Sequence, residues 1–221
     1  MSKREYDIAQ QTEEPQNGEV IFWVKGTESA TDVINGVVPT IQKSYDSAAG
    51  NIDSEKGLYC ANNTRYNAAL KYDMSGTEYL NKLLNASEIL MELTIYPTSI
   101  GGSGSNQYTS VGMGTFTTTS NNGRPFKNIF YNNGDNPEVR LGCIVDYNEF
   151  TTLYSKFTIV DGVYMLHDYW SSVYETPVQS NSGYPLLSDF NEELWVFFKI
   201  WSGPGAFKGY LKELKITVWN D

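Results

Sequence analysis

The last stretch of the chain constrains the fold most, because it contains two long apolar segments separated by turn residues. The segments are Glu193–Trp201 and Phe207–Trp219, and residues 202–206 between them read Ser-Gly-Pro-Gly-Ala. Glycine accepts a positive φ and proline fixes φ, so this composition predicts a tight turn. The sequence therefore predicts a hairpin, and strands this apolar need a second sheet packed against them.

Alternation within the two segments predicts which side chains face that second sheet. One face of the first segment carries Leu194, Val196, Phe198 and Ile200. The opposite face carries Trp195, Phe197, Lys199 and Trp201. In the second segment, Leu214, Ile216 and Val218 alternate with Lys215, Thr217 and Trp219. Leu211 is out of phase with Leu214, which predicts a β-bulge near Lys212 and Glu213.

Shorter strands separated by turn residues fill most of the remaining chain. The pattern predicts strands at residues 19–24, 57–62, 67–73, 89–96, 109–118, 126–131, 138–145, 154–160 and 163–170. We expect the second and third of these to pair, Pro97 to stop the fourth, and Asp161-Gly162 to form a two-residue hairpin turn.

One helix is predicted. Ser75 and Glu78 match a capping box, and apolar residues follow at helical spacing at Tyr79, Leu80, Leu83 and Leu84. Strands and helices do not alternate, which disfavours a parallel α/β sheet. The expected fold is all-β: a two-sheet antiparallel β-sandwich (jelly roll) with one short helix over residues 19–221. Residues 1–18 are expected to form an extended polar arm, either a disordered tail or a segment that docks on a neighbouring subunit.

Charge excludes some partners. The net charge is −10 at pH 7, so the surface repels phosphate backbones and anionic lipids, and neither nucleic acid nor a membrane is expected as a partner.

The N-terminus lacks the apolar core of a signal peptide, so we expect either use without secretion or a signal already removed. Cys60 and Cys143 are expected to be buried free thiols, although a disulfide is the alternative.

The order of several landmarks resembles that of concanavalin A-like, laminin G-like jelly-roll domains. The landmarks are Glu19–Val24, Asp32–Pro39, Gly57–Tyr59, Ile89–Thr98 and Phe207–Ile216. In that family a strand ending in Pro-Thr and a closing pattern F-x-G-x-[IL]-x-x-[LI]-x-[IV] are typical. The resemblance implies the jelly-roll fold. It does not select a function, because the fold hosts lectins, adhesion modules, hydrolases and virion proteins.

Catalytic patterns are weak in this sequence. The glucanase branch of that family uses a strand with Glu-x-Asp-x-Glu, whereas this chain has Glu88 and Glu92 with Leu90 between them. His167 is the only histidine, and a strand would turn it away from the neighbouring Asp168. We therefore expect no enzyme activity and no catalytic residue.

Metal binding is also expected to be absent, with calcium left open. No zinc-ligand spacing is present. Oxygen donors for calcium are available at Asp32, Asp135, Asn136 and Asp161, but they form no ligand-spaced motif.

Aromatic side chains are the most suggestive candidates for a binding function. They are Trp195, Phe197, Trp201, Trp219, Tyr169, Trp170 and Tyr174. Three interpretations are open: burial under residues 171–193, a subunit interface, or a platform on which sugar rings stack.

Three functions remain as hypotheses. The favoured one is a non-enzymatic structural or adhesive virion protein, such as a phage capsid decoration, tail or fibre component, bound to other subunits or as a homo-oligomer. The alternative is a secreted or cell-surface carbohydrate-binding module, located extracellularly. The third is a glycoside hydrolase with a degenerate site. The native open reading frame would separate the first two.

Overall fold

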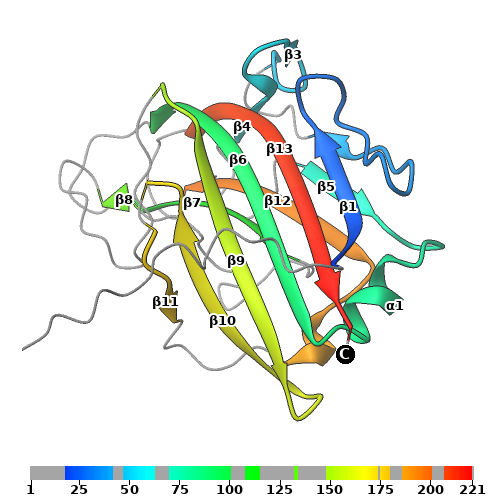
Figure 1. The fold of residues 1–221 in the computed structure, drawn as a ribbon. Coiled ribbons are helices and arrows are strands. Elements are labelled where there is room, and N and C mark those ends of the chain that lie inside the picture. The colour runs from blue at the N-terminus through cyan, green and yellow to red at the C-terminus, as the bar shows by residue number, and fades with distance from the viewer. Residues whose placement is uncertain are drawn as a thin grey trace, which may run out of the picture.

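The computed structural model describes residues 18–41, 47–62, 70–100, 108–114, 132–133, 148–173, 175–179, 186–200 and 207–220. Within these residues the chain forms two antiparallel sheets, one of eight strands and one of five, which confirms the predicted β-sandwich. Figure 1 shows the larger sheet in front and strands of the smaller sheet passing behind it.

The larger sheet is built around the C-terminal strand. Its strand order is β11-β10-β9-β6-β13-β4-β3, and β1 also pairs with β13. The bounds are β1 (Glu19–Lys25), β3 (Ile52–Asp53), β4 (Gly57–Asn62), β6 (Glu88–Ile100), β9 (Thr151–Val160), β10 (Tyr164–Ser171), β11 (Val178–Gln179) and β13 (Phe207–Trp219).

The smaller sheet has the order β2-β5-β12-β7-β8. Its strands are β2 (Thr40–Ile41), β5 (Leu70–Asp73), β7 (Tyr108–Gly114), β8 (Asn132–Asn133) and β12 (Glu193–Ile200). Two short helices complete the described elements, α1 (Tyr79–Leu84) and the 3-10 turn η2 (Leu187–Asp189).

The bulge predicted in the last strand is confirmed. The pairing of β13 with β6 shifts register between Leu211 and Glu213. On the other edge of β13, residues before the bulge pair with β4 and residues from Glu213 onward pair with β1. The N–H of Gly26 donates to the carbonyl of Lys212 at 2.8 Å, which fixes the point where the two neighbours separate.

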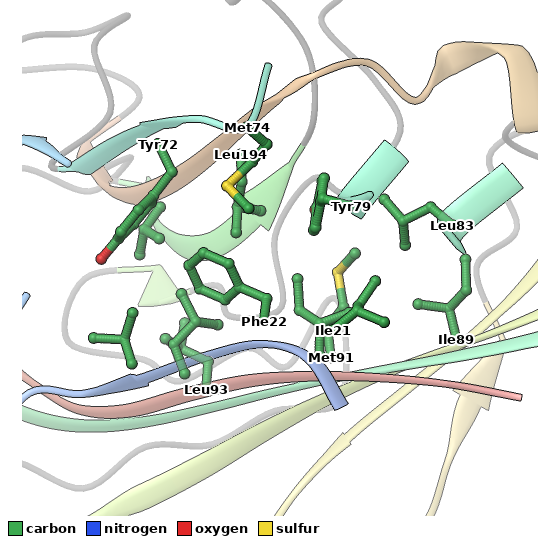
Figure 2. Packing of buried hydrophobic residues seen from close by; sticks show 14 of the residues in the cluster. Ile21, Phe22, Tyr72, Met74, Tyr79, Leu83, Ile89, Met91, Leu93 and Leu194 are labelled. Atoms are coloured by element: carbon green, nitrogen blue, oxygen red, sulfur yellow. The ribbon is translucent and has the colours of Figure 1, made fainter. Parts of the chain in front are cut away.

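The core lies between the two sheets, as Figure 2 shows. Phe22 of β1 packs edge-on against Tyr72 of β5, with ring centroids 4.9 Å apart and an interplanar angle of 85°. Tyr79 and Leu83 of α1 are fully buried and close one end of this core (Figure 2). The helix therefore closes one end of the sandwich. A helix this short is stable only when its apolar face packs against the rest of the fold.

The predicted terminal hairpin is wrong. Both strands exist, but β12 belongs to the smaller sheet and β13 to the larger, so residues 201–206 join the two sheets. The predicted pairing of 57–62 with 67–73 fails in the same way, because β4 and β5 lie in different sheets. Alternation fixes the face of a strand but not its neighbour.

Two local predictions are also wrong. Strand β6 continues through Pro97 to Ile100, and a register shift between Lys208 and Gly209 of β13 accommodates the proline at that point. At α1 the N-cap residue is Glu78 and its side chain makes no capping hydrogen bond, so the capping box does not form. A hairpin turn does form at Asp161-Gly162, where both residues have positive φ, but Val160 pairs with Tyr164, so the loop holds three residues and not the predicted two.

Membrane crossing by a helix finds no support in the described part of the chain, where no helix has the length and apolar character to span a bilayer.

Candidate functional site

The outer face of the larger sheet collects polar and aromatic side chains, because its strands keep strict alternation. In β9, buried Thr151, Leu153, Ser155 and Phe157 alternate with half-buried residues that point away from the core. The same pattern continues in β10 and β6. Register then decides which outward side chains stand next to one another.

One cross-strand line on this face, here called the tryptophan row, consists of Trp170, Tyr154, Glu92, Lys215 and Trp23. Each residue is the direct Cα partner of the next, across β10, β9, β6, β13 and β1. Adjacent strands are about 4.8 Å apart, so the row spans about 19 Å. Rings stand at its two ends and opposite charges stand at its centre.

Contacts within the tryptophan row are specific. The rings of Tyr154 and Trp170 stack with centroids 5.1 Å apart and an interplanar angle of 10°. The Lys215 ammonium lies 2.8 Å from a Glu92 carboxylate oxygen. Burial, followed by the Glu92 charge, raises the pKa of the Tyr154 phenol, so that hydroxyl remains a hydrogen-bond donor at neutral pH.

Trp23 is held at the far end of the row. Its indole N–H donates to Glu213 at 2.6 Å, and the Lys25 ammonium lies 4.5 Å from the ring centroid. Fixed rings lose little conformational freedom when a ligand stacks on them, which favours binding.

A second line, here called the tyrosine row, crosses the same face nearer the other end of β6. Tyr59, Tyr210 and Tyr96 are successive Cα partners on β4, β13 and β6. Phe150, which is 41% exposed, extends the row by contact with Tyr96. The face therefore carries two aromatic lines, one richer in charge pairs and one richer in rings.

The sequence-predicted aromatic residues do not form one site. Trp170 lies in the tryptophan row, while Trp195 lies on the outer face of the smaller sheet, where its indole N–H donates to Glu193 at 2.9 Å. Trp219 is on β13 in the larger sheet and packs against Gly18, so the expected grouping of Trp195 with Trp219 is wrong. Tyr169 is 2% exposed and faces the core, so it is not a surface residue.

The remaining predicted positions are not described. The side chain of Phe197 and the whole of Trp201 and Tyr174 lie outside the described residues. Sequence reasoning missed Trp23 and Tyr154, although the outward phase of their strands marks both. Only the register of β10, β9, β6, β13 and β1 brings them together, and no local pattern encodes that register.

The glutamates that resemble a glucanase pair are both engaged by lysines. Glu88 contacts Lys156 at 2.9 Å and Glu92 contacts Lys215 at 2.8 Å. Leu90 stands between them on the same face, in the place of the family's aspartate. A glycosidase needs one carboxyl to deliver a proton and another to attack or activate water. Here each carboxylate pairs with a lysine of a neighbouring strand.

Two other candidate reactive residues, His167 and Cys60, are buried. His167 is buried, stacks on Phe157 with centroids 4.3 Å apart, and its Nε2 lies 3.1 Å from the Ser155 hydroxyl. Cys60 is a buried free thiol, and burial raises its pKa. Cys143 lies outside the described residues.

Of the four calcium candidates, the structure describes Asp32 and Asp161. The Asp32 carboxylate is fully buried and accepts the backbone N–H groups of Trp23, Ile34 and Asn35. Asp161 lies in the exposed β9–β10 turn, and residues 135 and 136 are not described. Within the described ranges no three His, Cys, Asp or Glu side chains gather as a metal site would require.

No family model matches the chain, and no curated protein sequence matches it. Solved structures do resemble it. One is domain 4 of AbnA, a GH43 extracellular arabinanase from Geobacillus stearothermophilus, in complex with arabinotriose. It has 13% identity and a TM-score of 0.45, and the match covers 92% of this chain and 94% of that one.

Two further likenesses are weaker in sequence. The carbohydrate recognition domain of Emp47p has 9% identity and a TM-score of 0.39, with 90% of this chain and 95% of that chain covered. A structure of botulinum neurotoxin type C, described as entering cells through interaction with two ganglioside molecules, has 8% identity and a TM-score of 0.47. That match covers 91% of this chain and 48% of the toxin chain. The described residues of this chain form a two-sheet antiparallel β-sandwich.

Proposed function

We propose that this chain is a non-catalytic carbohydrate-binding module that holds an oligosaccharide on the outer face of its larger sheet. The observation that carries the proposal is the tryptophan row, in which rings at both ends flank an ion pair at the centre. Sugar rings have an apolar C–H face and a hydroxyl rim. The row offers a partner to each.

Stacking would supply most of the affinity. The weakly positive C–H groups of a sugar favour the negative face of an aromatic ring. Trp170 turns one ring face to Tyr154 and is half-buried, and we assign its opposite ring face to the ligand. Trp23 offers a second ring at the opposite end of the row.

Polar groups at the centre would supply orientation. Glu92 and Lys215 are each 21% exposed, so the pair is partly dry yet within reach of a ligand. A carboxylate accepts from two neighbouring hydroxyls and an ammonium donates to them, and charge-assisted hydrogen bonds of this kind are the stronger ones.

The test compares tryptophans on the two outer faces. Glycan-array screening of the purified chain identifies a bound oligosaccharide, and calorimetry then measures Trp170→Ala and Trp195→Ala. We expect Trp170→Ala to weaken binding by about tenfold or more, since removing a ring on which a ligand stacks typically costs about 1.4 kcal/mol or more. Trp195→Ala is the matched control, because it removes a tryptophan that is likewise half-buried but lies on the outer face of the smaller sheet.

Loss of binding in Trp195→Ala with retention in Trp170→Ala would place the ligand on the smaller sheet. Binding of no glycan at all would reject the proposal. Hydrolysis of the bound sugar that disappears in Glu88→Gln would favour the hydrolase hypothesis over a binding module.

The virion role expected from the sequence stays a prediction. It is compatible with the proposed function, because an adhesive virion protein would use the same kind of surface. The carbohydrate-binding module is preferred because its support comes from named side chains on one face of the sheet.

A further inference from the structure

Among the described residues, the tyrosine row is the longest run of aromatic contacts on the outer face of the larger sheet. Ring centroids are 5.2 Å apart between Tyr59 and Tyr210, 6.2 Å between Tyr210 and Tyr96, and 5.1 Å between Tyr96 and Phe150. These spacings follow the separation of neighbouring strands. Four rings in line are more than one sugar needs, so the row suits an oligosaccharide.

Two lysines lie over this row. The Lys56 ammonium is 5.2 Å from the Tyr96 ring centroid and 5.7 Å from that of Tyr210. The Lys212 ammonium is 4.1 Å from the Phe150 centroid. Lys212 belongs to the bulge of β13, and that bulge places its side chain on the exposed surface.

These lysines differ from those of the tryptophan row in their electrostatic surroundings. Lys215 is paired with Glu92, and Lys25 lies 3.9 Å from Glu28. Among the ion pairs within the described residues, none engages Lys56 or Lys212. Asp53 lies close enough to interact electrostatically with Lys56, but its carboxylate accepts the backbone N–H groups of Glu55 and Lys56.

Lysines that form no ion pair with a carboxylate of the described residues are notable on a chain of net charge −10. Their positive heads and the aromatic faces beneath them together match a ligand that is both flat-faced and negatively charged. We infer that the tyrosine row, with Lys56 and Lys212, is a second carbohydrate site that selects a carboxylate-bearing sugar. This inference rests on the proposed function in taking the outer face of the larger sheet as carbohydrate-binding.

When the ligand binds, it displaces a lysine from the face of a ring. In the free chain the ammonium groups lie over the rings. A sugar that stacks on Tyr96 or Tyr210 moves Lys56 aside and offers its own carboxylate as the new partner. A neutral sugar offers no carboxylate, so nothing offsets the free-energy cost of displacing the lysine from the ring.

An acidic peptide is the competing occupant. It would satisfy the two lysines, but it has no rigid apolar face to fill a line of four rings. The row therefore favours an acidic oligosaccharide, and a peptide becomes one arm of the test.

The experiment measures calorimetric binding of trigalacturonic acid, its fully methyl-esterified form and a triglutamate peptide to the full chain. The two sugars share their rings and differ in charge. We expect the acid to bind at least about tenfold more tightly than the ester. Lys56→Met should reduce that preference by about tenfold, as should Lys212→Met, because each removes one charge-assisted contact.

Lys25→Met is the matched control, since it removes a lysine that lies 4.5 Å from a ring centroid in the tryptophan row. It should leave the affinity for trigalacturonate unchanged. Trp170→Ala should likewise leave it unchanged while weakening the ligand of the tryptophan row, so the two sites are tested separately. Raising the NaCl concentration from 20 to 200 mM should weaken only the acidic ligand.

Equal binding of acid and ester, or no binding of the acid, would overturn the inference without touching the tryptophan row. Equal weakening by Lys25→Met and Lys56→Met would show a general charge effect and would also overturn it. Triglutamate binding as tight as that of trigalacturonate would assign the row to acidic peptides.

Discussion

At the scale of single residues, His167 makes the fold sensitive to acid. Burial lowers its pKa to about 4, from an ordinary value near 6.5. Between these two values the unfolded chain takes up a proton that the folded chain does not. Stability is therefore unaffected by this residue above about pH 6.5 and falls as the pH is lowered toward 4.

We predict that His167 lowers the free energy of unfolding by about 2 kcal/mol between pH 7 and pH 5. His167→Gln keeps a polar group for Ser155 and cannot titrate, so its unfolding free energy should fall by correspondingly less. Urea denaturation of both proteins at the two pH values measures the difference. An identical fall in both would show that other groups cause the acid sensitivity.

Asp32 is a buried acidic residue in the loop after β1. It was a candidate calcium ligand, yet its buried carboxylate joins the loop after β1 to the strand itself through Trp23 and Asn35. We predict that Asp32→Ala destabilises the chain by about 3 kcal/mol or more, because several buried donors lose their acceptor. Asp73→Ala, which removes an exposed carboxylate that accepts the Ser75 backbone N–H, should cost much less stability than Asp32→Ala.

Thermal or urea denaturation compares the two aspartate variants. Similar losses would mean that the Asp32 hydrogen bonds are replaced by water.

At the scale of elements, the bulge in β13 depends on close backbone approach. A Cβ atom on Gly57 would lie 2.1 Å from the Leu211 carbonyl oxygen, and Gly57 has a φ of +109°. Gly76 also has a positive φ, of +77°, but nothing lies within 4 Å of where its Cβ would be. Alanine at Gly76 therefore tests the conformational cost of a side chain alone, whereas alanine at Gly57 adds the steric cost.

We predict that Gly76→Ala lowers stability by about 1 kcal/mol through backbone strain alone. Gly57→Ala should cost clearly more, since the β3–β4 turn has to move away from β13. Urea denaturation midpoints, at unchanged m-value, provide the comparison. Equal losses of stability in both variants would mean that the β3–β4 turn moves away from β13 without destabilising the fold.

The sequence predicted the positions of the strands well, but it did not predict which strands pair. Alternation located β9, β10, β12 and β13, and the phase slip at Leu211 located the bulge. Neighbouring strands in sequence were assumed to be neighbours in space, which fails for β12 and β13. The candidate site depends on that same pairing, so Trp170 was found and its row partner Trp23 was not.

At the scale of the whole molecule, self-repulsion is the general electrostatic effect. A net charge of −10 disfavours the compact state, while the described ion pairs are mostly partly exposed and contribute little each. We predict that raising NaCl from 20 to 200 mM increases the melting temperature at pH 7. Differential scanning calorimetry measures it, and a fall in Tm would show that the ion pairs outweigh the repulsion.

The two limits of the described sandwich also lie side by side. Glu19 pairs with Val218, and Gly18 packs against the Trp219 ring, so entry and exit share one corner of the larger sheet (Figure 1). A short linker from residue 219 to residue 18 would close the polypeptide into a ring, and new ends could be opened at the exposed Asp161-Gly162 turn. The same geometry would let the unit be spliced into a surface loop of a host protein.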